Sequence, residues 1–194
     1  MPAIWLSGNF AGVMILYLVL TSGYSLWARR VELLDVFFLA GLYTIRLVAG
    51  YVVGIAYSAW LLIFSMFVFL SLALLKRYTE LAEQSCGTGR PIDNGRGYRS
   101  EDLQLVASLG TSCGYLATLV LGLYVNSQQV LLLYKQPMLL LLVCPLWLYW
   151  ISRVWLIAHR GEMHDDPVVF ALKDRCSYLI GSLILLVLWM ATIR

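Results

Sequence analysis

Long apolar stretches alternate with short polar connections along almost the whole chain. Each stretch is close to the roughly 20 residues that a helix needs to cross a bilayer. The stretches are continuous, unlike the alternating segments of about 10 residues that build a membrane β-barrel. The pattern therefore predicts about six membrane-spanning helices, over residues 4–28, 32–53, 58–83, 101–125, 137–158 and 168–193.

Composition supports the bilayer as the solvent of this chain. Hydrophobic residues make up 61% of the sequence and charged residues only 13%, which is too apolar for a soluble domain with a wet surface. We expect one all-α, polytopic transmembrane domain over residues 1–194. The net charge of +3 would suit nucleic acid in a soluble protein, but the basic residues lie in alternate connections, as in membrane proteins. We therefore expect no nucleic-acid partner.

The distribution of basic residues predicts the orientation. They gather at residues 29–30, 76–99 and 153–175, whereas the connections at 54–57 and 126–136 contain only Lys135. Basic connections face the cytoplasm, so the polar loops at 84–100 and 159–167 are expected there, in what is most simply a bacterial plasma membrane. Both termini then face outward. A chain that begins outside predicts that an odd number of upstream helices is absent from this sequence.

The connection before the last apolar stretch, residues 159–175, concentrates titratable side chains. Carboxylates at a membrane edge are costly and suggest a functional site. Asp165, Asp166 and Asp174 offer the oxygen ligands that Mg²⁺ prefers, and this ion commonly bridges to substrate phosphates. On one continuous helix, Asp166 and Asp174 would lie about 80° apart and face broadly the same side.

A structural interpretation stands beside this one. Asp166 followed by Pro167 is the pattern of a helix N-cap and its first helical residue. Asp174 lies between Lys173 and Arg175, and such a trio also suits a solvated helix surface whose side chains reach the interface. Capping does not explain Asp174 if it lies about two turns inside the helix, as we expect.

Other charges lie within the predicted helices. Lys76 and Glu80 have i,i+4 spacing and are expected to pair, although Lys76 or Arg77 could instead turn toward an anionic headgroup. Arg46 lies deep in the second predicted helix and is expected to point into the bundle. Asp35 is three turns away, too far to be its direct partner. Two candidates remain: Glu and Tyr groups of a polar cavity, or helices outside this chain.

Four stretches, residues 24–30, 43–50, 76–81 and 160–175, resemble the UbiA superfamily of polyprenyl transferases, and more closely its branch related to decaprenyl-phosphate phosphoribosyltransferase. The resemblance implies a nine-helix bundle, of which this chain would be the C-terminal six, with Mg²⁺ held by two Asp-rich motifs. Residues 165–174 would be the second motif. The first, of the Asn-Asp-x-x-Asp type, is not in the sequence, so we expect this N-terminally truncated chain to be inactive alone.

The resemblance also implies roles for individual residues. Catalysis and metal binding fall to Asp166 and Asp174, and the headgroup contacts to Arg29, Lys76 and Arg77. Beside these, we expect Asp165 as a further metal ligand and Arg46, Lys173 and Arg175 as further substrate contacts. The implied reaction is prenyl transfer to an acceptor, or phosphoribosyl transfer to a polyprenyl phosphate. The partners would be the phosphorylated polyprenyl lipid, membrane lipids and an upstream polypeptide that supplies the missing helices. A non-enzymatic scaffold or transporter half is the competing hypothesis.

Overall fold

The computed structural model describes residues 3–28, 31–52, 58–85, 98–127, 130, 133–163 and 166–193, with side chains from residue 12 onward except at 48–52 and 84–85. The long helices are α1 (Ala3–Leu26), α2 (Leu34–Val52), α3 (Ala59–Ser85), α4 (Leu103–Val125), α6 (Val143–His159) and α8 (Arg175–Ile193). Short helical segments are η2 (Ser100–Asp102), η3 (Pro137–Leu142) and α7 (Pro167–Lys173). Most of the polar loop predicted at 84–100 lies outside the described residues.

The predicted all-helical fold is confirmed for the residues that the structure describes. Within the described residues, four helical segments are long and apolar enough to cross a bilayer: Ala59–Glu83, Ser100–Val125, Pro137–His159 and Arg175–Ile193. Helices also occupy the first two predicted positions, as α1 and α2. That these two cross the bilayer as well stays a prediction.

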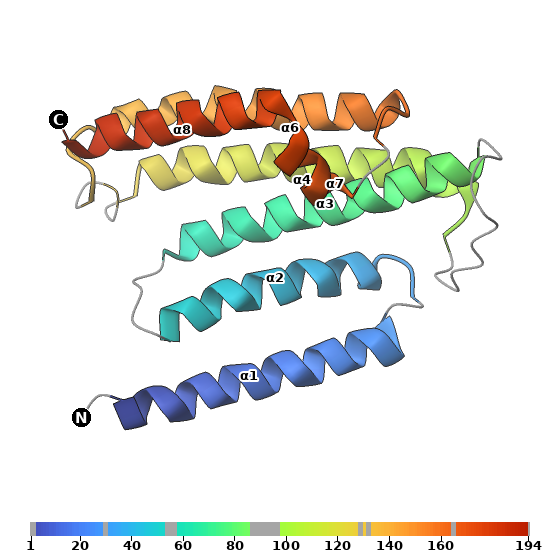
Figure 1. The fold of residues 1–194 in the computed structure, drawn as a ribbon, viewed down its shortest axis with the longest axis horizontal. Helices are drawn as coiled ribbons and strands as arrows, with labels where there is room; N and C mark the ends of the chain where they lie inside the picture. The colour runs from blue at the N-terminus through green and yellow to red at the C-terminus, as the bar shows by residue number, and fades with distance from the viewer. Residues whose placement is uncertain are drawn as a thin grey trace.

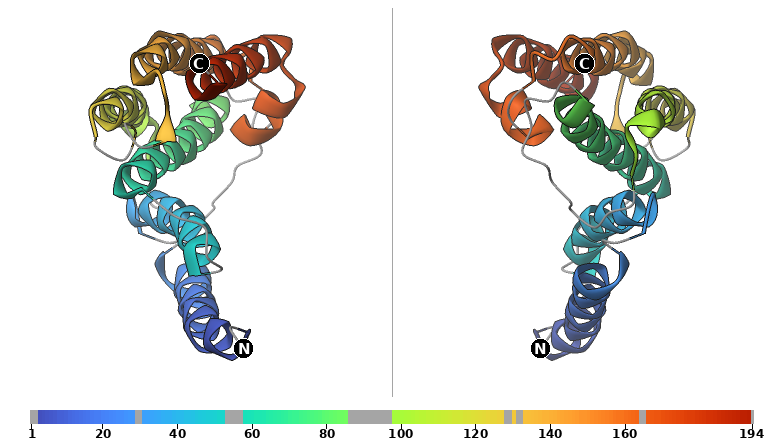
Figure 2. Two further views of the ribbon diagram at one scale, coloured as in Figure 1. Left: turned by 90° about the vertical axis from the view of Figure 1, so that its left-hand side faces the viewer. Right: turned by 90° about the vertical axis from the view of Figure 1, so that its right-hand side faces the viewer.

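The helices form a bundle with a thin extension. α3, α4, α6 and α8 pack together, while α2 packs on α3 and α1 packs on α2 (Figures 1 and 2). Figure 2 shows α1 and α2 reaching away from the bundle as a single layer. The long helices run alternately in opposite directions, so the ends next to the three basic connections lie at one end of the molecule (Figure 1). This arrangement agrees with the charge pattern.

The core lies where α3, α4 and α6 meet, around Leu75 and Ile151, which are fully buried. A Cβ atom at Gly110 would lie 2.2 Å from the indole of Trp155. The Ser71 hydroxyl donates to the Gly110 carbonyl at 2.6 Å and accepts from the Trp155 indole N–H at 3.2 Å. A residue without a side chain thus lets these helices approach closely, as is common in membrane bundles.

The prediction of one unbroken last helix over 168–193 is wrong. α7 ends at Lys173, α8 begins at Arg175, and Asp174 between them has an extended backbone with φ −78° and ψ 123°. The Asp174 carboxylate accepts hydrogen bonds from the amide and the hydroxyl of Ser177 at 2.8 and 2.9 Å, so it caps the start of α8. The 80° relation between Asp166 and Asp174 therefore does not apply, because a helix boundary separates them.

The alternating helix directions predict which surface residues share a side of the membrane. In a variant without native cysteines, we expect Glu32→Cys and Glu162→Cys to react with a membrane-impermeant maleimide only after the cytoplasmic face is opened. Gln136→Cys, at the opposite end, should react in intact cells. All three native side chains are exposed. Labelling of positions 32 and 162 from different sides would contradict the arrangement.

Candidate functional site

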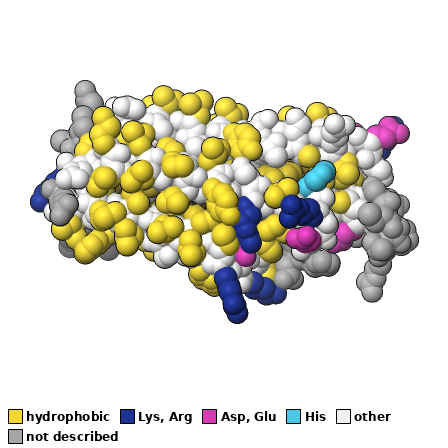
Figure 3. Space-filling model, turned by 90° about the horizontal axis from the view of Figure 1, so that it is seen from above, with side chains coloured by type: hydrophobic (Ala, Val, Ile, Leu, Met, Phe, Trp, Pro, Cys, Tyr) yellow, Lys and Arg dark blue, Asp and Glu magenta, His cyan; other side chains and the backbone are white. Residues whose placement is uncertain are grey.

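Charged side chains gather toward the end of the bundle where α3 and α6 finish and α7 begins. Figure 3 shows Lys, Arg, Asp, Glu and His side chains together in one half of a largely apolar face. α7 contacts both α3 and α8 in this region. This region, with its four helices α3, α6, α7 and α8, is called the charged end below.

The first ion pair of the charged end joins α3 to α7. The Lys76 ammonium lies 2.5 Å from the carboxylate of Asp166, and the two side chains are 43% and 35% exposed. The other Asp166 oxygen accepts from the amide of Val168 at 3.0 Å, which makes Asp166 the N-cap of α7, with Pro167 as its first residue. Capping by Asp166 is confirmed, and Lys76 pairs across helices with Asp166.

The environment of Asp166 keeps it ionised. Partial burial alone would raise the pKa of this carboxyl group. The hydrogen bond from Lys76, the amide of Val168 and the Lys76 charge outweigh burial and hold the pKa below its ordinary value of 3.8. At neutral pH the pair is therefore a salt bridge between two charged groups.

The second ion pair joins α6 to the α7–α8 boundary. The Arg153 guanidinium donates to both oxygens of Asp174, at 2.6 and 3.1 Å. This two-bond geometry matches the planar donors of arginine to a carboxylate. Burial acts to raise the pKa of Asp174, but the bonds from Arg153 and Ser177 hold it below the ordinary value. Asp174 is thus a helix cap and an arginine partner at once.

A third, buried network joins α2 to α3. Arg77 Nε lies 2.6 Å from Asp35, and the two side chains are 3% and 0% exposed. Arg77 also donates to Glu80 through Nη1. The structure thus gives Arg77 a structural role as the centre of a buried ion network, an alternative to the phosphate contact that the sequence predicted. Glu80, expected to pair with Lys76, contacts Arg77 instead.

Tyr98 closes this network from the segment before α4. Its hydroxyl donates to Asp35 at 2.8 Å and accepts from the amide of Leu33 at 2.8 Å. Burial, and then the bond to Asp35, raise the pKa of Tyr98, so the phenol stays a donor. Leu33 has a φ of 63°, which is unfavourable for a branched side chain. The bond to Tyr98 helps to hold that turn at the start of α2.

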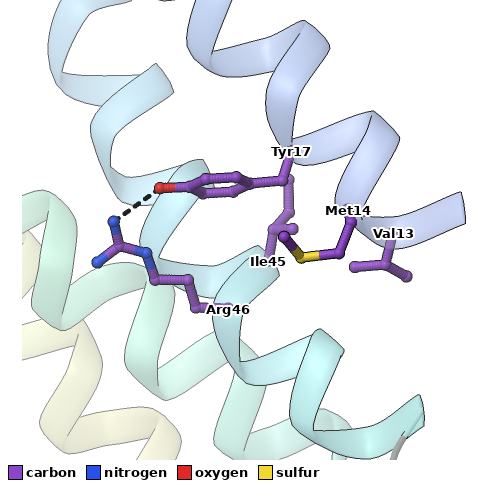
Figure 4. Close-up of a pocket in the computed structure, with 5 residues that line it drawn as sticks. All are labelled: Val13, Met14, Tyr17, Ile45 and Arg46. Atoms are coloured by element: carbon purple, nitrogen blue, oxygen red, sulfur yellow. Dashed lines mark hydrogen bonds between the residues drawn. The ribbon is translucent and has the colours of Figure 1, made fainter. Parts of the chain in front are cut away.

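Arg46 does not point into the bundle, so that prediction is wrong. Its side chain is exposed on α2 and donates to the Tyr17 hydroxyl of α1 at 2.7 Å (Figure 4). The guanidinium also lies 5.2 Å from the ring centroid of Tyr43 and 5.5 Å from that of Tyr17. The reason is the position of α2, which belongs to the thin layer and not to a closed bundle. A tyrosine contact was among the alternatives from the sequence, but the polar cavity expected with it is not seen among the described residues, since Val13, Met14 and Ile45 line the hollow beside Tyr17.

The remaining predicted contacts are placed only in part. Lys173 and Arg175 are exposed at the end of α7 and the start of α8, on either side of Asp174. Arg29 and Asp165 lie outside the described residues. The predicted headgroup role of these residues stays a prediction.

The described carboxylates do not fit the predicted Mg²⁺ site. No group of three or more His, Cys, Asp or Glu side chains converges within the described part of the chain. Asp166 and Asp174 already share their oxygens with Lys76 and Arg153 and with backbone amides. A hard cation would have to displace these partners. Magnesium binding by residues 165–174 therefore stays a prediction from the sequence.

Sequence reasoning missed the partners that organise the ion pairs described above. Arg153 and Asp35 were noted as charges but not paired, and Tyr98 was not singled out. Their partners lie 21, 42 and 63 residues away, so local spacing carries no signal for them. His159, whose Nδ1 lies 3.0 Å from the hydroxyl of Tyr78 across 81 residues, is a further case.

Comparison with known proteins places the chain beside two rhizobial sequences. No family model matches it. It is 42% identical over 185 residues to the uncharacterized protein y4nM of Sinorhizobium fredii, covering 94% of this chain and 36% of that protein. It is 37% identical over 162 residues to the nodulation protein NoeC of Azorhizobium caulinodans, covering 83% of this chain and 52% of that protein. The chain thus spans about a third to a half of these relatives.

Asp35→Asn is expected to lower the free energy of unfolding by about 3–5 kcal/mol, as loss of one partner from a buried ion pair does. The reason is that Arg77 loses the charge of Asp35 in a site from which water is excluded. Equilibrium unfolding in detergent micelles measures the change. The matched control is Glu32→Gln, three residues earlier and exposed, which should stay within about 0.5 kcal/mol. Equal effects of the two changes would contradict the network.

Acid should weaken the charged end, because the pKa of Asp166 and of Asp174 is lowered in the folded protein. A lowered pKa gives stability that is fully present above the ordinary value of 3.8 and is lost as the pH falls through the folded-state value. We expect the melting temperature to fall in this window. Asp174→Asn should make the melting temperature fall less steeply with pH in this window. Glu101→Gln, at an exposed position, is the control and should leave that slope unchanged. An unchanged slope in Asp174→Asn would contradict the assignment.

Proposed function

We propose that this chain forms part of an intramembrane transferase that acts on a polyprenyl phosphate or diphosphate. The observation that carries the proposal is the meeting of cationic and apolar surface at α7. Lys76 is 43% exposed beside α7, and Lys173 and Arg175 are exposed at its far end. The exposed hydrophobic side chains of α7 lie between them: Val168, Val169 and Leu172.

Such a surface suits an amphiphilic lipid with a charged head. A lysine ammonium has three donors and no acceptor, and the exposed part of Lys76 leaves room for a second anion beside Asp166. The apolar surface of α7 would lie along the first isoprene units. Cations held near a departing phosphate stabilise the charge that develops on it. The proposal therefore gives Lys76 the headgroup contact, with Lys173 and Arg175 as neighbouring cations.

Two reactions fit this binding. In prenyl transfer, the bond between the allylic carbon and the diphosphate oxygen breaks and diphosphate leaves. The acceptor forms the new bond to that carbon and releases a proton. In phosphoribosyl transfer, an oxygen of the lipid phosphate attacks the ribose carbon, and diphosphate leaves from the sugar donor. The resemblance of residues 160–175 favours the phosphoribosyl branch. In both reactions this chain supplies cations for a phosphorylated lipid.

The name of one relative indicates a biological process but no reaction. NoeC is named a nodulation protein, and we propose that the lipid-linked product of this chain serves a similar process at the cell envelope. Because the chain covers about half of that protein or less, the activity of the whole protein is part of the proposal.

A non-enzymatic membrane scaffold is the second candidate. The observation in its favour is that Asp166 and Asp174 cap helices and pair with Lys76 and Arg153, as structural residues do. On this alternative, the charged end fixes α7 in place and binds no phosphorylated lipid.

Binding of a polyprenyl phosphate separates the two candidates. We expect the purified chain in lipid nanodiscs to retain polyprenyl phosphate but not the matching polyprenol, as measured by native mass spectrometry. Lys76→Gln should weaken retention about tenfold, the cost of one charge-assisted hydrogen bond. The matched control is Lys135→Gln at the opposite end of the bundle, which is also exposed.

Equal retention of phosphate and alcohol, or equal effects of the two lysine changes, would favour the scaffold. Because the sequence has no Asn-Asp-x-x-Asp motif, we expect binding without turnover from these residues alone. Incubation with a prenyl diphosphate and an aromatic acceptor, or with phosphoribosyl diphosphate and the lipid phosphate, tests that expectation.

A further inference from the structure

Arg46 is a charged residue at mid-depth of the apolar layer formed by α1 and α2. It lies twelve residues after Leu34, the first residue of α2, which is about 18 Å along the axis at 1.5 Å per residue. The hydrocarbon core of a bilayer is about 30 Å thick. If α2 spans the membrane from the end with the basic connections, Arg46 therefore lies near the middle of the core, where an arginine facing lipid is costly.

The direction of the Arg46 side chain adds to the cost of placing its charge in the membrane core. Side chains of a helix tilt toward its N-terminus, and Arg46 does so, because its guanidinium reaches Tyr17 on the neighbouring α1 (Figure 4). It therefore leans toward the middle of α2 and away from Val52, the nearer helix end. The contacts it makes there are to phenol groups, Tyr17 and Tyr43. Because phenols are neutral, the described part of the chain gives this positive charge no counterion.

The sequence has no carboxylate that a second copy could bring to this depth. Its eleven acidic residues all lie between the long helices or within two turns of a helix end next to a basic connection. A second copy in the same orientation would bring another Arg46 at the same level. Lipid phosphates lie at the edge of the core, about 15 Å from its centre. The counterion therefore has to come from another polypeptide segment.

The surface around Arg46 has room for such a segment. A hollow lined by Val13, Met14, Tyr17, Ile45 and Arg46 opens beside the guanidinium (Figure 4). An added Cβ at Gly12 or at Gly41 would meet nothing within 4 Å. Close approach at glycine is how helices commonly associate in membranes.

We propose that the α1–α2 layer is the docking surface for a membrane-spanning helix from outside these residues, which places an Asp or Glu against Arg46 at mid-depth. The carboxylate completes an ion pair with the guanidinium, and Tyr17 holds that guanidinium in position. This interaction is independent of the transferase chemistry proposed above.

The test uses two synthetic membrane-spanning helices of leucine and alanine that differ only at the central residue, which is Asp in one and Leu in the other. Association with the purified chain in lipid bilayers is measured by energy transfer between fluorophores on helix and chain. We expect the Asp helix to bind about tenfold more tightly, as polar contacts between membrane helices allow. Arg46→Gln should remove the difference, and Arg46→Lys should keep part of it.

One control variant and the outcomes that would overturn the proposal complete the test. Arg160→Gln, which changes an exposed arginine directly after α6, should leave the preference for the Asp helix intact. Energy transfer between two labelled copies of the chain that disappears in Arg46→Gln would overturn the proposal in favour of a second copy. Equal binding of the Asp and Leu helices, or a preference that survives in Arg46→Gln, would also overturn it.

Discussion

The buried pair of Arg77 and Asp35 is the interaction on which the attachment of α1 and α2 depends. Both side chains are almost completely shielded from solvent. A charge in such a place is tolerated only with a partner and further hydrogen bonds, and here the two partners come from different helices. α2 therefore cannot leave α3 without separating the buried Asp35 carboxylate from its arginine. Through α2 the pair also positions α1, which packs against α2. Tyr98 connects a third segment of the chain, the one before α4, to the same network.

The same requirement organises the other side of the bundle. α7 has only seven residues, too few to be stable as an isolated helix. Two aspartates hold it: Asp166 at its start pairs with Lys76 of α3, and Asp174 at its end pairs with Arg153 of α6. Each aspartate also caps a helix, so one side chain satisfies a charge and exposed backbone amides together. These pairs fix the orientation in which α7 presents its apolar side chains beside the cations.

Arg46 follows the same rule with a different outcome. Like Arg77, it is an arginine within an apolar helix. Its described partners, however, are neutral phenols, and its side chain is exposed. Asp35 and Arg46 lie on the same helix, but only Asp35 has an oppositely charged partner among the described residues. We therefore assign Asp35 to a structural contact and Arg46 to a docking surface. The charged end and the α1–α2 layer are thus two separate surfaces, one suited to a phosphorylated lipid and one to a helix with a carboxylate.

The sequence by itself determined where the helices lie and which ends face the same way. Apolar stretches of membrane length predict the helices, because backbone groups in an apolar environment must pair with one another. Alternate basic connections predict which helix ends lie together. Asp166 as a cap of Pro167 was also readable, since the signal lies in adjacent residues. Only the tertiary structure decided that Asp174 breaks the last helix, that Arg77 is buried with Asp35, and that Arg46 lies on an open layer. These facts depend on partners 21 to 42 residues apart, and periodicity within one helix specifies its faces but not the neighbours that those faces meet.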